Sequence, residues 1–132
     1  MKKLVIVVAA IIENELGEIL CALRSPKMST PNMWEFPGGK VEANEDIHSA
    51  LKREIVEELD CKIETSKKVF IDSTHEYETV IIHLLSIKCK VMEGSPTPRE
   101  HSKLIWLKRE NLDSLKWAPA DIPVVQQLIH EK

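Results

Sequence analysis

The sequence has little cysteine and no excess of positive charge. Its three cysteines, Cys21, Cys61 and Cys89, are odd in number and widely spaced. This excludes a disulfide framework or a zinc-binding cysteine pattern and favours a reducing, cytoplasmic location. Eighteen basic and twenty-one acidic residues give a formal net charge of −3. A nucleic-acid polymer is therefore not expected as a partner, because such binding needs a strongly basic face.

Long hydrophobic runs are also missing. The apolar segment Leu4–Ile12 follows Lys2 and Lys3 and so resembles the start of a signal peptide. It is too short to span a bilayer, and no cleavage pattern of small residues follows it. Its richness in valine and isoleucine predicts a buried first strand instead. We therefore expect neither export nor a membrane partner.

The 132 residues, 43% hydrophobic and 30% charged, have the size and composition of a single globular domain spanning residues 1–132. An apolar residue at every fourth position predicts one long helix, Asn44–Leu59, with Asn44 as its N-cap. Without regular strand–helix alternation, the pattern indicates an α/β (α+β) fold with a mixed sheet. The other predicted elements are strands at Leu4–Ile12, Glu18–Leu23, Trp34–Phe36, Lys62–Ile71, Glu78–Val91 and Leu104–Leu107, and short helices at Arg109–Leu115 and Ile122–Glu131.

Three carboxylates are concentrated on the long predicted helix. Glu54, Glu57 and Glu58 occupy positions i, i+3 and i+4, which share one helix face. Like charges at this spacing destabilise a helix unless a cation lies among them. Oxygen ligands of this kind favour Mg²⁺, Mn²⁺ or Ca²⁺ over zinc. Taken alone, the three residues fit a solvated acidic face better than a metal site.

The residues before and within this helix favour a metal site over a solvated acidic face. Phe36-Pro37-Gly38-Gly39-Lys40 precedes it, and paired glycines let a backbone approach a ligand closely. Arg53 lies four residues before Glu57, where it either orients that carboxylate or forms a surface ion pair.

This pattern resembles the Nudix box of the Nudix hydrolase family. The matching residues are Gly39, Glu45, Arg53-Glu54-Ile55 and Glu57-Glu58, at the spacing of the box. Trp34–Lys40 and Ala118–Pro123 are similar to the MutT-like branch, most of all to its CTP pyrophosphohydrolase members. The resemblance covers nearly the whole chain. It implies a mixed β-sheet sandwiched between helices.

Asp60 departs from the box, which usually has glycine at this position near the helix C-terminus. Glycine there supplies a left-handed backbone conformation. Aspartate is among the few other residues that tolerate this conformation, so we expect a cost of about 1 kcal/mol or less. No ligand is lost by this change.

The resemblance also implies a set of metal ligands and their supports. Glu54, Glu57, Glu58 and the Gly38 carbonyl would hold Mg²⁺, or alternatively Mn²⁺. Arg53 would hold these glutamates in place, and Glu45 would support them without touching the ion. Glu100 would ligate metal or take a proton from the attacking water, although a surface charge in a loop explains it equally well.

Further residues would bind the substrate. Arg24 and Lys40 either pair with phosphates or form surface salt bridges. Asp121 precedes Ile122-Pro123 and so predicts a helix N-cap, but the resemblance also places it at the base-recognition position. Tyr77 and His75 lie near the strand that faces the base in relatives, and Trp117 is a weaker candidate for bordering the base.

Asp121 bears most directly on base preference. Ionised aspartate only accepts hydrogen bonds, and the cytosine N4 amino group donates them. Asp121 therefore favours cytosine, although a protonated carboxyl could also donate and would weaken this preference.

The leading hypothesis is a Mg²⁺-dependent pyrophosphohydrolase that converts CTP, dCTP or modified pyrimidine nucleotides to a nucleoside monophosphate and pyrophosphate. One alternative is hydrolysis of 8-oxo-dGTP, and another is a non-catalytic module that senses nucleotides. The expected partner is a small nucleotide, and the chain is expected to be a monomer or homodimer.

Overall fold

A computed structural model describes residues 2–131, and its centre is a five-stranded mixed sheet. The long strands β1 (Lys3–Ile12) and β7 (Val80–Glu93) pair in parallel along their length. On the outer side of β1, β4 (Gly38–Lys40) pairs antiparallel. Two strands pair antiparallel with different halves of β7: β5 (Lys62–Thr65) and β6 (Ile71–Glu76).

A second, three-stranded sheet has β2 (Glu18–Leu23) between β3 (Trp34–Glu35) and β8 (Lys103–Lys108). Both of its pairings are antiparallel. β8 leads into the short 3₁₀ helix η1 (Arg109–Ser114). A 3₁₀ turn, η2 (Pro119–Asp121), then continues directly into α2 (Ile122–His130).

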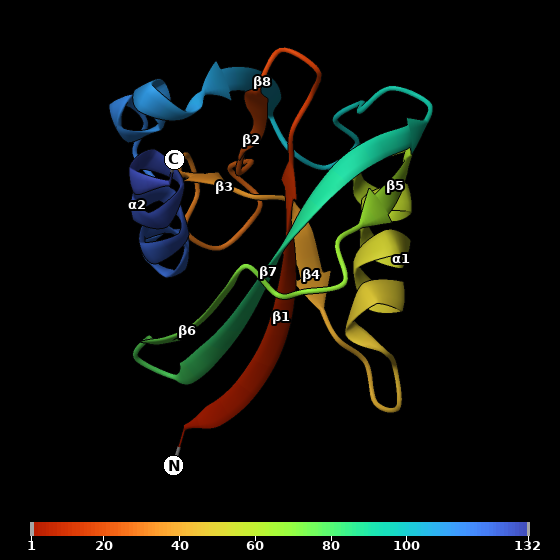
Figure 1. Cartoon of the computed structure of the whole chain (residues 1–132). Helices are drawn as coiled ribbons and strands as arrows, with labels where there is room; N and C mark the ends of the chain where they lie inside the picture. The colour runs from red at the N-terminus through yellow and green to blue at the C-terminus, as the bar shows by residue number, and fades with distance from the viewer. Residues whose placement is uncertain (1, 132) are drawn as a thin grey trace.

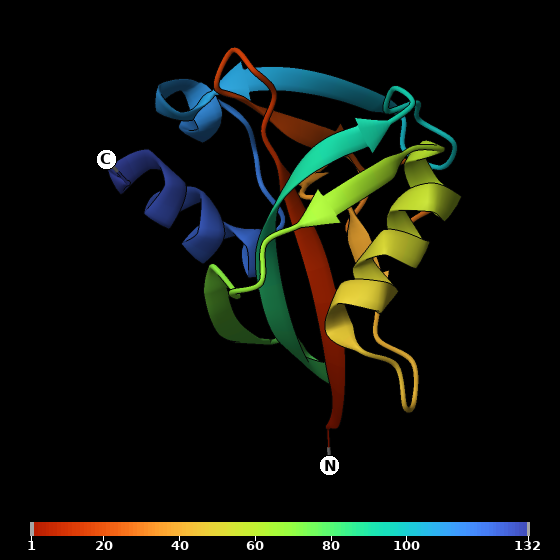
Figure 2. The same cartoon turned by 45° about the vertical axis from the view of Figure 1, so that its right-hand side comes forward.

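Helix α1 (Ile47–Leu59) and helix α2 lie on opposite sides of the central sheet (Figures 1 and 2). Because side chains alternate along a strand, β1 contributes to both layers. Val8, Ala10 and Ile12 pack towards α1, whereas Ala9 and Ile11 pack towards α2. The mixed sheet between helices predicted from the resemblance is therefore confirmed.

Helix α1 begins later than predicted, and the N-cap assigned to Asn44 is wrong. Asn44 has a φ of 64°, whereas an N-cap needs extended backbone. Asp46 has that conformation, and its carboxylate accepts a hydrogen bond from the Ser49 N–H at 3.1 Å. The helix ends as expected at Asp60, whose φ of 54° and ψ of 42° are left-handed.

Two strands differ from the predictions. The predicted strand Lys62–Ile71 is interrupted after Thr65, and the chain returns as β6, whose polar residues alternate between half-buried and exposed. Residues Gly38 and Gly39 belong to strand β4, which was not among the predicted strands. Both strands were missed because their stability comes from pairing with β1 or β7, while their own residues have little strand propensity.

Near the C-terminus, the helix predicted at Arg109–Leu115 is a 3₁₀ helix, and the helix predicted from Ile122 is confirmed. No helix formed by residues 2–131 combines the length and apolar content needed to cross a bilayer.

Candidate active site

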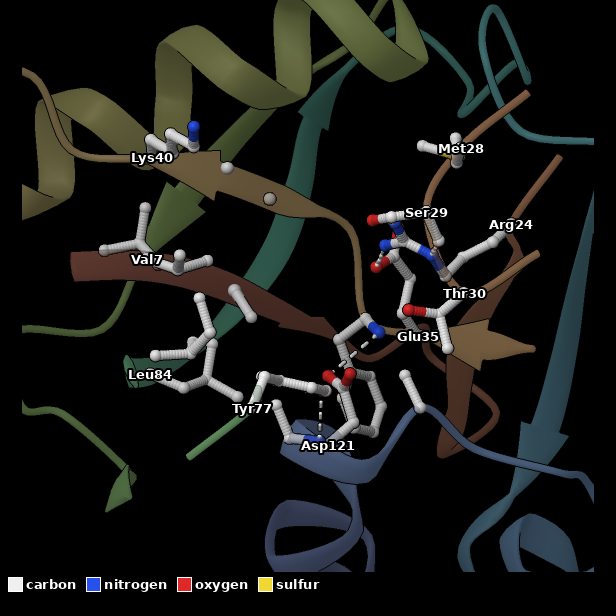
Figure 3. Close-up of a pocket in the computed structure, with 18 of the residues that line it drawn as sticks. Val7, Arg24, Met28, Ser29, Thr30, Glu35, Lys40, Tyr77, Leu84 and Asp121 are labelled. Atoms are coloured by element: carbon white, nitrogen blue, oxygen red, sulfur yellow. Dashed lines mark hydrogen bonds and ion pairs between the residues drawn. The ribbon is translucent and has the colours of Figure 1, made fainter. Parts of the chain in front are cut away.

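A cavity of about 500 Å³ lies between β4, the central sheet, the 25–33 loop and η2 (Figure 3). Its floor is the sheet face that carries Val7, Ile82 and Leu84. Figure 3 shows Tyr77 and Asp121 on one side of the cavity and Lys40 beside α1 on the other. The polar residues that line it include Arg24, Ser29, Thr30, Glu35, Lys40, Glu58, Tyr77, Thr79 and Asp121. Several predicted site residues therefore meet in one place.

The two glycines of β4 allow the backbone to approach its neighbours closely. A Cβ atom on Gly38 would lie 1.9 Å from the Val8 carbonyl oxygen, a contact with backbone that cannot move aside. A Cβ on Gly39 would lie 2.4 Å from the Glu54 carboxyl carbon. Gly39 thus leaves room for the Glu54 carboxylate between α1 and β4.

Arg53 organises the carboxylates at this end of α1. Its Nε and Nη2 donate to the two oxygens of Glu45 at 2.7 and 2.9 Å, and its Nη1 donates to Glu54 at 2.8 Å. Nη2 also donates to the Lys40 carbonyl at 3.2 Å, which joins α1 to β4. The guanidinium of Arg53 lowers the pKa of Glu45 to about 2, chiefly through these hydrogen bonds. This arrangement agrees with the supporting roles predicted for Arg53 and Glu45.

Glu58 is the buried carboxyl of the group, with only 7% of its side chain exposed. Burial chiefly, together with contact with Glu54 and the charges of Glu35 and Glu100, raises the pKa of Glu58 from 4.5 to about 9. Several carboxylates therefore crowd one small volume with too little positive charge among them. A divalent cation with oxygen ligands would relieve this crowding, so the donor set fits such an ion.

Glu57 differs from its neighbours because its side chain is 58% exposed, with one oxygen 3.7 Å from Arg53 Nη1. Within residues 2–131, no three acidic, histidine or cysteine side chains already converge as a ready set of metal ligands. The assignment of Glu54, Glu57, Glu58 and the Gly38 carbonyl to an ion therefore stays a prediction.

Asp121 is buried on the opposite side of the cavity. Asp121 occupies the N-cap position of α2, as predicted, but its carboxylate makes no capping hydrogen bond to the helix. Instead, Oδ1 accepts a hydrogen bond from the Phe36 N–H at 3.4 Å, which ties η2 to the segment between β3 and β4. Burial and the nearby charge of Glu35 raise the pKa of Asp121 well above its ordinary value.

Tyr77 and Trp117, which were both considered for the base pocket, lie in different places. Tyr77 lines the cavity, and its hydroxyl accepts a hydrogen bond from the Ala120 N–H at 3.2 Å. The His75 ring packs edge-on against Tyr77. Trp117, the weaker candidate for bordering the base, does not line the cavity. Its ring stacks on Phe36, and its Nε1 donates to the Leu112 carbonyl at 2.7 Å within the core.

Arg24 lies at the cavity wall, and each of its three guanidinium nitrogens donates a hydrogen bond within the protein. Its Nε donates to the Ser29 carbonyl at 2.6 Å, its Nη2 donates to the Ser29 hydroxyl at 3.0 Å, and its Nη1 donates to Glu35. Lys40 lines the cavity on the side of β4. Binding of phosphate by Arg24 and Lys40 stays a prediction.

Two residues of this region were missed by the sequence analysis. Glu35 accepts from Arg24 and lies 2.7 Å from Nε2 of His101, whose side chain is fully buried. Both were overlooked because of the residues beside them. Glu35 lies between aromatic residues that indicated a packed strand, and the functional role in this loop was assigned to Glu100 and not to the adjacent His101. An acidic residue between two large aromatics in a short, half-buried strand is the signal that could have identified Glu35.

Comparisons with known proteins agree with this geometry. The family model described as NUDIX domain matches residues 7–127. The chain is 38% identical to the CTP pyrophosphohydrolase of Escherichia coli over 94% of this chain and 90% of that protein. It is 33% identical to an 8-oxo-dGTP diphosphatase of Haemophilus influenzae over 98% and 95% of the two chains. A solution structure of the Nudix hydrolase MutT from methicillin-resistant Staphylococcus aureus superposes with a TM-score of 0.79, at 50% identity and over the full length of both chains.

Proposed function

The chain belongs to the Nudix hydrolase family, and from this premise we propose that it is a Mg²⁺-dependent nucleoside triphosphate pyrophosphohydrolase. Its preferred substrates in this proposal are CTP, dCTP or modified pyrimidine nucleotides, cleaved to a nucleoside monophosphate and pyrophosphate. Members of the family generally use divalent metal ions. The choice of Mg²⁺, with Mn²⁺ as a substitute, follows from the oxygen-rich donor set.

One observation carries the proposal: a single cavity is lined by the buried carboxyl of Glu58 at one side and by the buried carboxyl of Asp121 at the other. In this proposal, Glu58 and Gly38 would meet the metal ion of the triphosphate, and Asp121 would recognise the base; all three residues line the cavity. The apolar floor between them, with Val7 and Leu84, suits a flat base better than a second charged group.

At the carboxylate side, Glu54, Glu57, Glu58 and the Gly38 carbonyl would hold the ion. When bound, the ion supplies neutralisation of phosphate charge and lowers the pKa of a coordinated water. Arg53 keeps Glu54 oriented through the hydrogen bond described above. Glu100 is the candidate for accepting the proton of the attacking water, because its charge already influences Glu58.

At the base side, Asp121 would accept a hydrogen bond from the exocyclic amino group of cytosine. The raised pKa of Asp121 supports a second candidate, because a protonated carboxyl can also donate to a base that offers acceptors. Hydrolysis of 8-oxo-dGTP is that second candidate, and a relative of similar identity is named for this activity.

A nucleotide panel with product identification tests these proposals. CTP, dCTP, 5-methyl-dCTP, dGTP and 8-oxo-dGTP are each incubated with and without Mg²⁺, and pyrophosphate is distinguished from phosphate among the products. We expect pyrophosphate release only with Mg²⁺ and fastest with a cytosine nucleotide. Fastest release from 8-oxo-dGTP selects the second candidate, and no turnover of any nucleotide favours a nucleotide-sensing module.

The remaining predictions concern the setting of the protein. We propose that residues 1–132 form one domain, which the two cores on opposite faces of one sheet support. A cytoplasmic location, a monomeric or homodimeric state and the lack of polymeric nucleic-acid partners stay predictions from the sequence.

A further inference from the structure

His101 is a buried histidine placed between two acidic side chains. Its Nε2 lies 2.7 Å from the Glu35 carboxylate, a full hydrogen bond. Its Nδ1 has no hydrogen-bond partner and lies 3.9 Å from Oε1 of Glu58. This second distance is about 1 Å longer than a hydrogen bond. An unpaired, fully buried polar atom costs stability, so its direction towards Glu58 needs an explanation.

The contacts of Glu35 extend this arrangement to the cavity wall. Glu35 also accepts from Arg24, which in turn holds both the backbone and the side chain of Ser29. Ser29 belongs to the loop that lines the substrate cavity, whereas Glu58 belongs to α1. Hydrogen bonds therefore join the substrate-side loop to His101, whose Nδ1 lies 3.9 Å from the buried carboxyl of Glu58.

We propose that His101 is a positioning residue that orients Glu58 for the metal ion through Nδ1 and anchors Glu35 and Arg24 through Nε2. This inference rests on the proposed function, because it assigns Glu58 to the ion. His101 itself touches neither substrate nor ion in this assignment. Partners that orient a metal ligand from behind generally contribute 10–100-fold to metal affinity. Nδ1 would thus act on the metal side of the site, and Nε2 would act on the side that holds the substrate.

Two variants separate these contacts. An asparagine amide reproduces the position of Nδ1, and a glutamine amide reproduces that of Nε2. We expect His101→Gln to weaken Mn²⁺ binding without nucleotide by about 10-fold or more, while the KM for nucleotide at saturating metal stays within about 2-fold of wild type. His101→Asn should have the opposite pattern, with nearly unchanged Mn²⁺ affinity and a raised KM. Isothermal titration with Mn²⁺ alone measures the first quantity, and steady-state kinetics measure the second.

His48 provides the matched control. It lies on the same helix as Glu58, and its ring contacts the Thr65 hydroxyl at 3.2 Å, away from the cavity. His48→Gln and His48→Asn should leave both quantities unchanged. If either His101 variant fails to fold, Glu35→Ala serves instead, because it removes the anchor of His101 but not a metal ligand. We expect it to weaken Mn²⁺ binding several-fold.

The outcomes distinguish this inference from the proposed function. If wild-type protein takes up no Mn²⁺, the proposed function fails. If wild type binds Mn²⁺ and the two His101 variants weaken binding equally, or not at all, the positioning role is overturned. The same holds if Glu35→Ala leaves Mn²⁺ affinity unchanged.

Discussion

The carboxyl groups on the two sides of the cavity differ in their hydrogen-bond partners and in their pKa shifts. On the α1 side, Arg53 donates hydrogen bonds to Glu45 and Glu54 and holds the pKa of Glu45 low, whereas burial raises the pKa of Glu58. On the η2 side, Asp121 has a backbone N–H as its partner, and burial raises its pKa. The first side is suited to charge neutralisation and the second to hydrogen bonding. Substitutions that remove charge should therefore affect the first side most, and changes of donor and acceptor the second.

The largest expected effect is at the exposed carboxylate of the α1 side. Glu57→Gln should lower kcat by at least about 100-fold, because it removes a negative charge assigned to the metal ion. Glu57 is largely exposed, so the thermal stability of the metal-free protein should not change. Pyrophosphate release at saturating Mg²⁺ and a thermal melt measure the two quantities. A rate near that of wild type would remove Glu57 from the set of metal ligands.

Glu58→Gln should separate stability from activity on the same side. The pKa of Glu58 is raised from 4.5 to about 9 on folding, so the folded protein keeps a proton that the unfolded chain releases. The free energy of unfolding of the metal-free wild type should therefore fall as the pH rises from about 4.5 towards 9. Glu58→Gln should remove this decline and be about 1–3 kcal/mol more stable near neutral pH, while losing activity.

Urea unfolding across this pH range, with and without Mg²⁺, measures the effect. Mg²⁺ should stabilise wild type and not Glu58→Gln, because a ligand that binds the folded state shifts the equilibrium. Identical pH profiles for the two proteins would show that Glu58 titrates normally in the folded state.

The α1 side was also easier to predict from the sequence. Glu54, Glu57 and Glu58 lie on one helix, and helical spacing alone places them on one face. Gly39 and Arg53 lie within twenty residues of them, so local sequence and family resemblance pointed to the whole group. The start of the helix was placed wrongly, and strand β4 was missed.

The η2 side is assembled from distant parts of the chain, and much of it could not be predicted. Asp121 contacts Phe36 across 85 positions, and His101 contacts Glu35 across 66. No local pattern encodes such pairs, because they depend on how β3, β8 and η2 are brought together. The same reason left the position of Trp117 open, because its burial depends on stacking against Phe36.

Asp121→Asn sharpens the contrast by changing hydrogen bonding without changing shape. Asparagine offers both a donor and an acceptor at this position. We expect the ratio of kcat/KM for CTP to that for 8-oxo-dGTP to fall by about 10-fold, the size of one well-made base contact. Mg²⁺ affinity should not change, because the substitution lies on the other side of the cavity. An unchanged substrate ranking would limit Asp121 to holding the Phe36 backbone.

The smallest effect is expected at Tyr77, which helps to hold η2 in place. Tyr77→Phe removes the hydroxyl that accepts from Ala120 and keeps the ring that packs on His75. A single hydrogen bond of this kind contributes about 1 kcal/mol, so KM should rise by about 5-fold or less. The kcat should stay unchanged because the hydroxyl lies beside Asp121 and not beside the carboxylates. A fall in kcat with constant KM would instead place Tyr77 at the reacting phosphates and break the division of the cavity into a charged side and a hydrogen-bonding side.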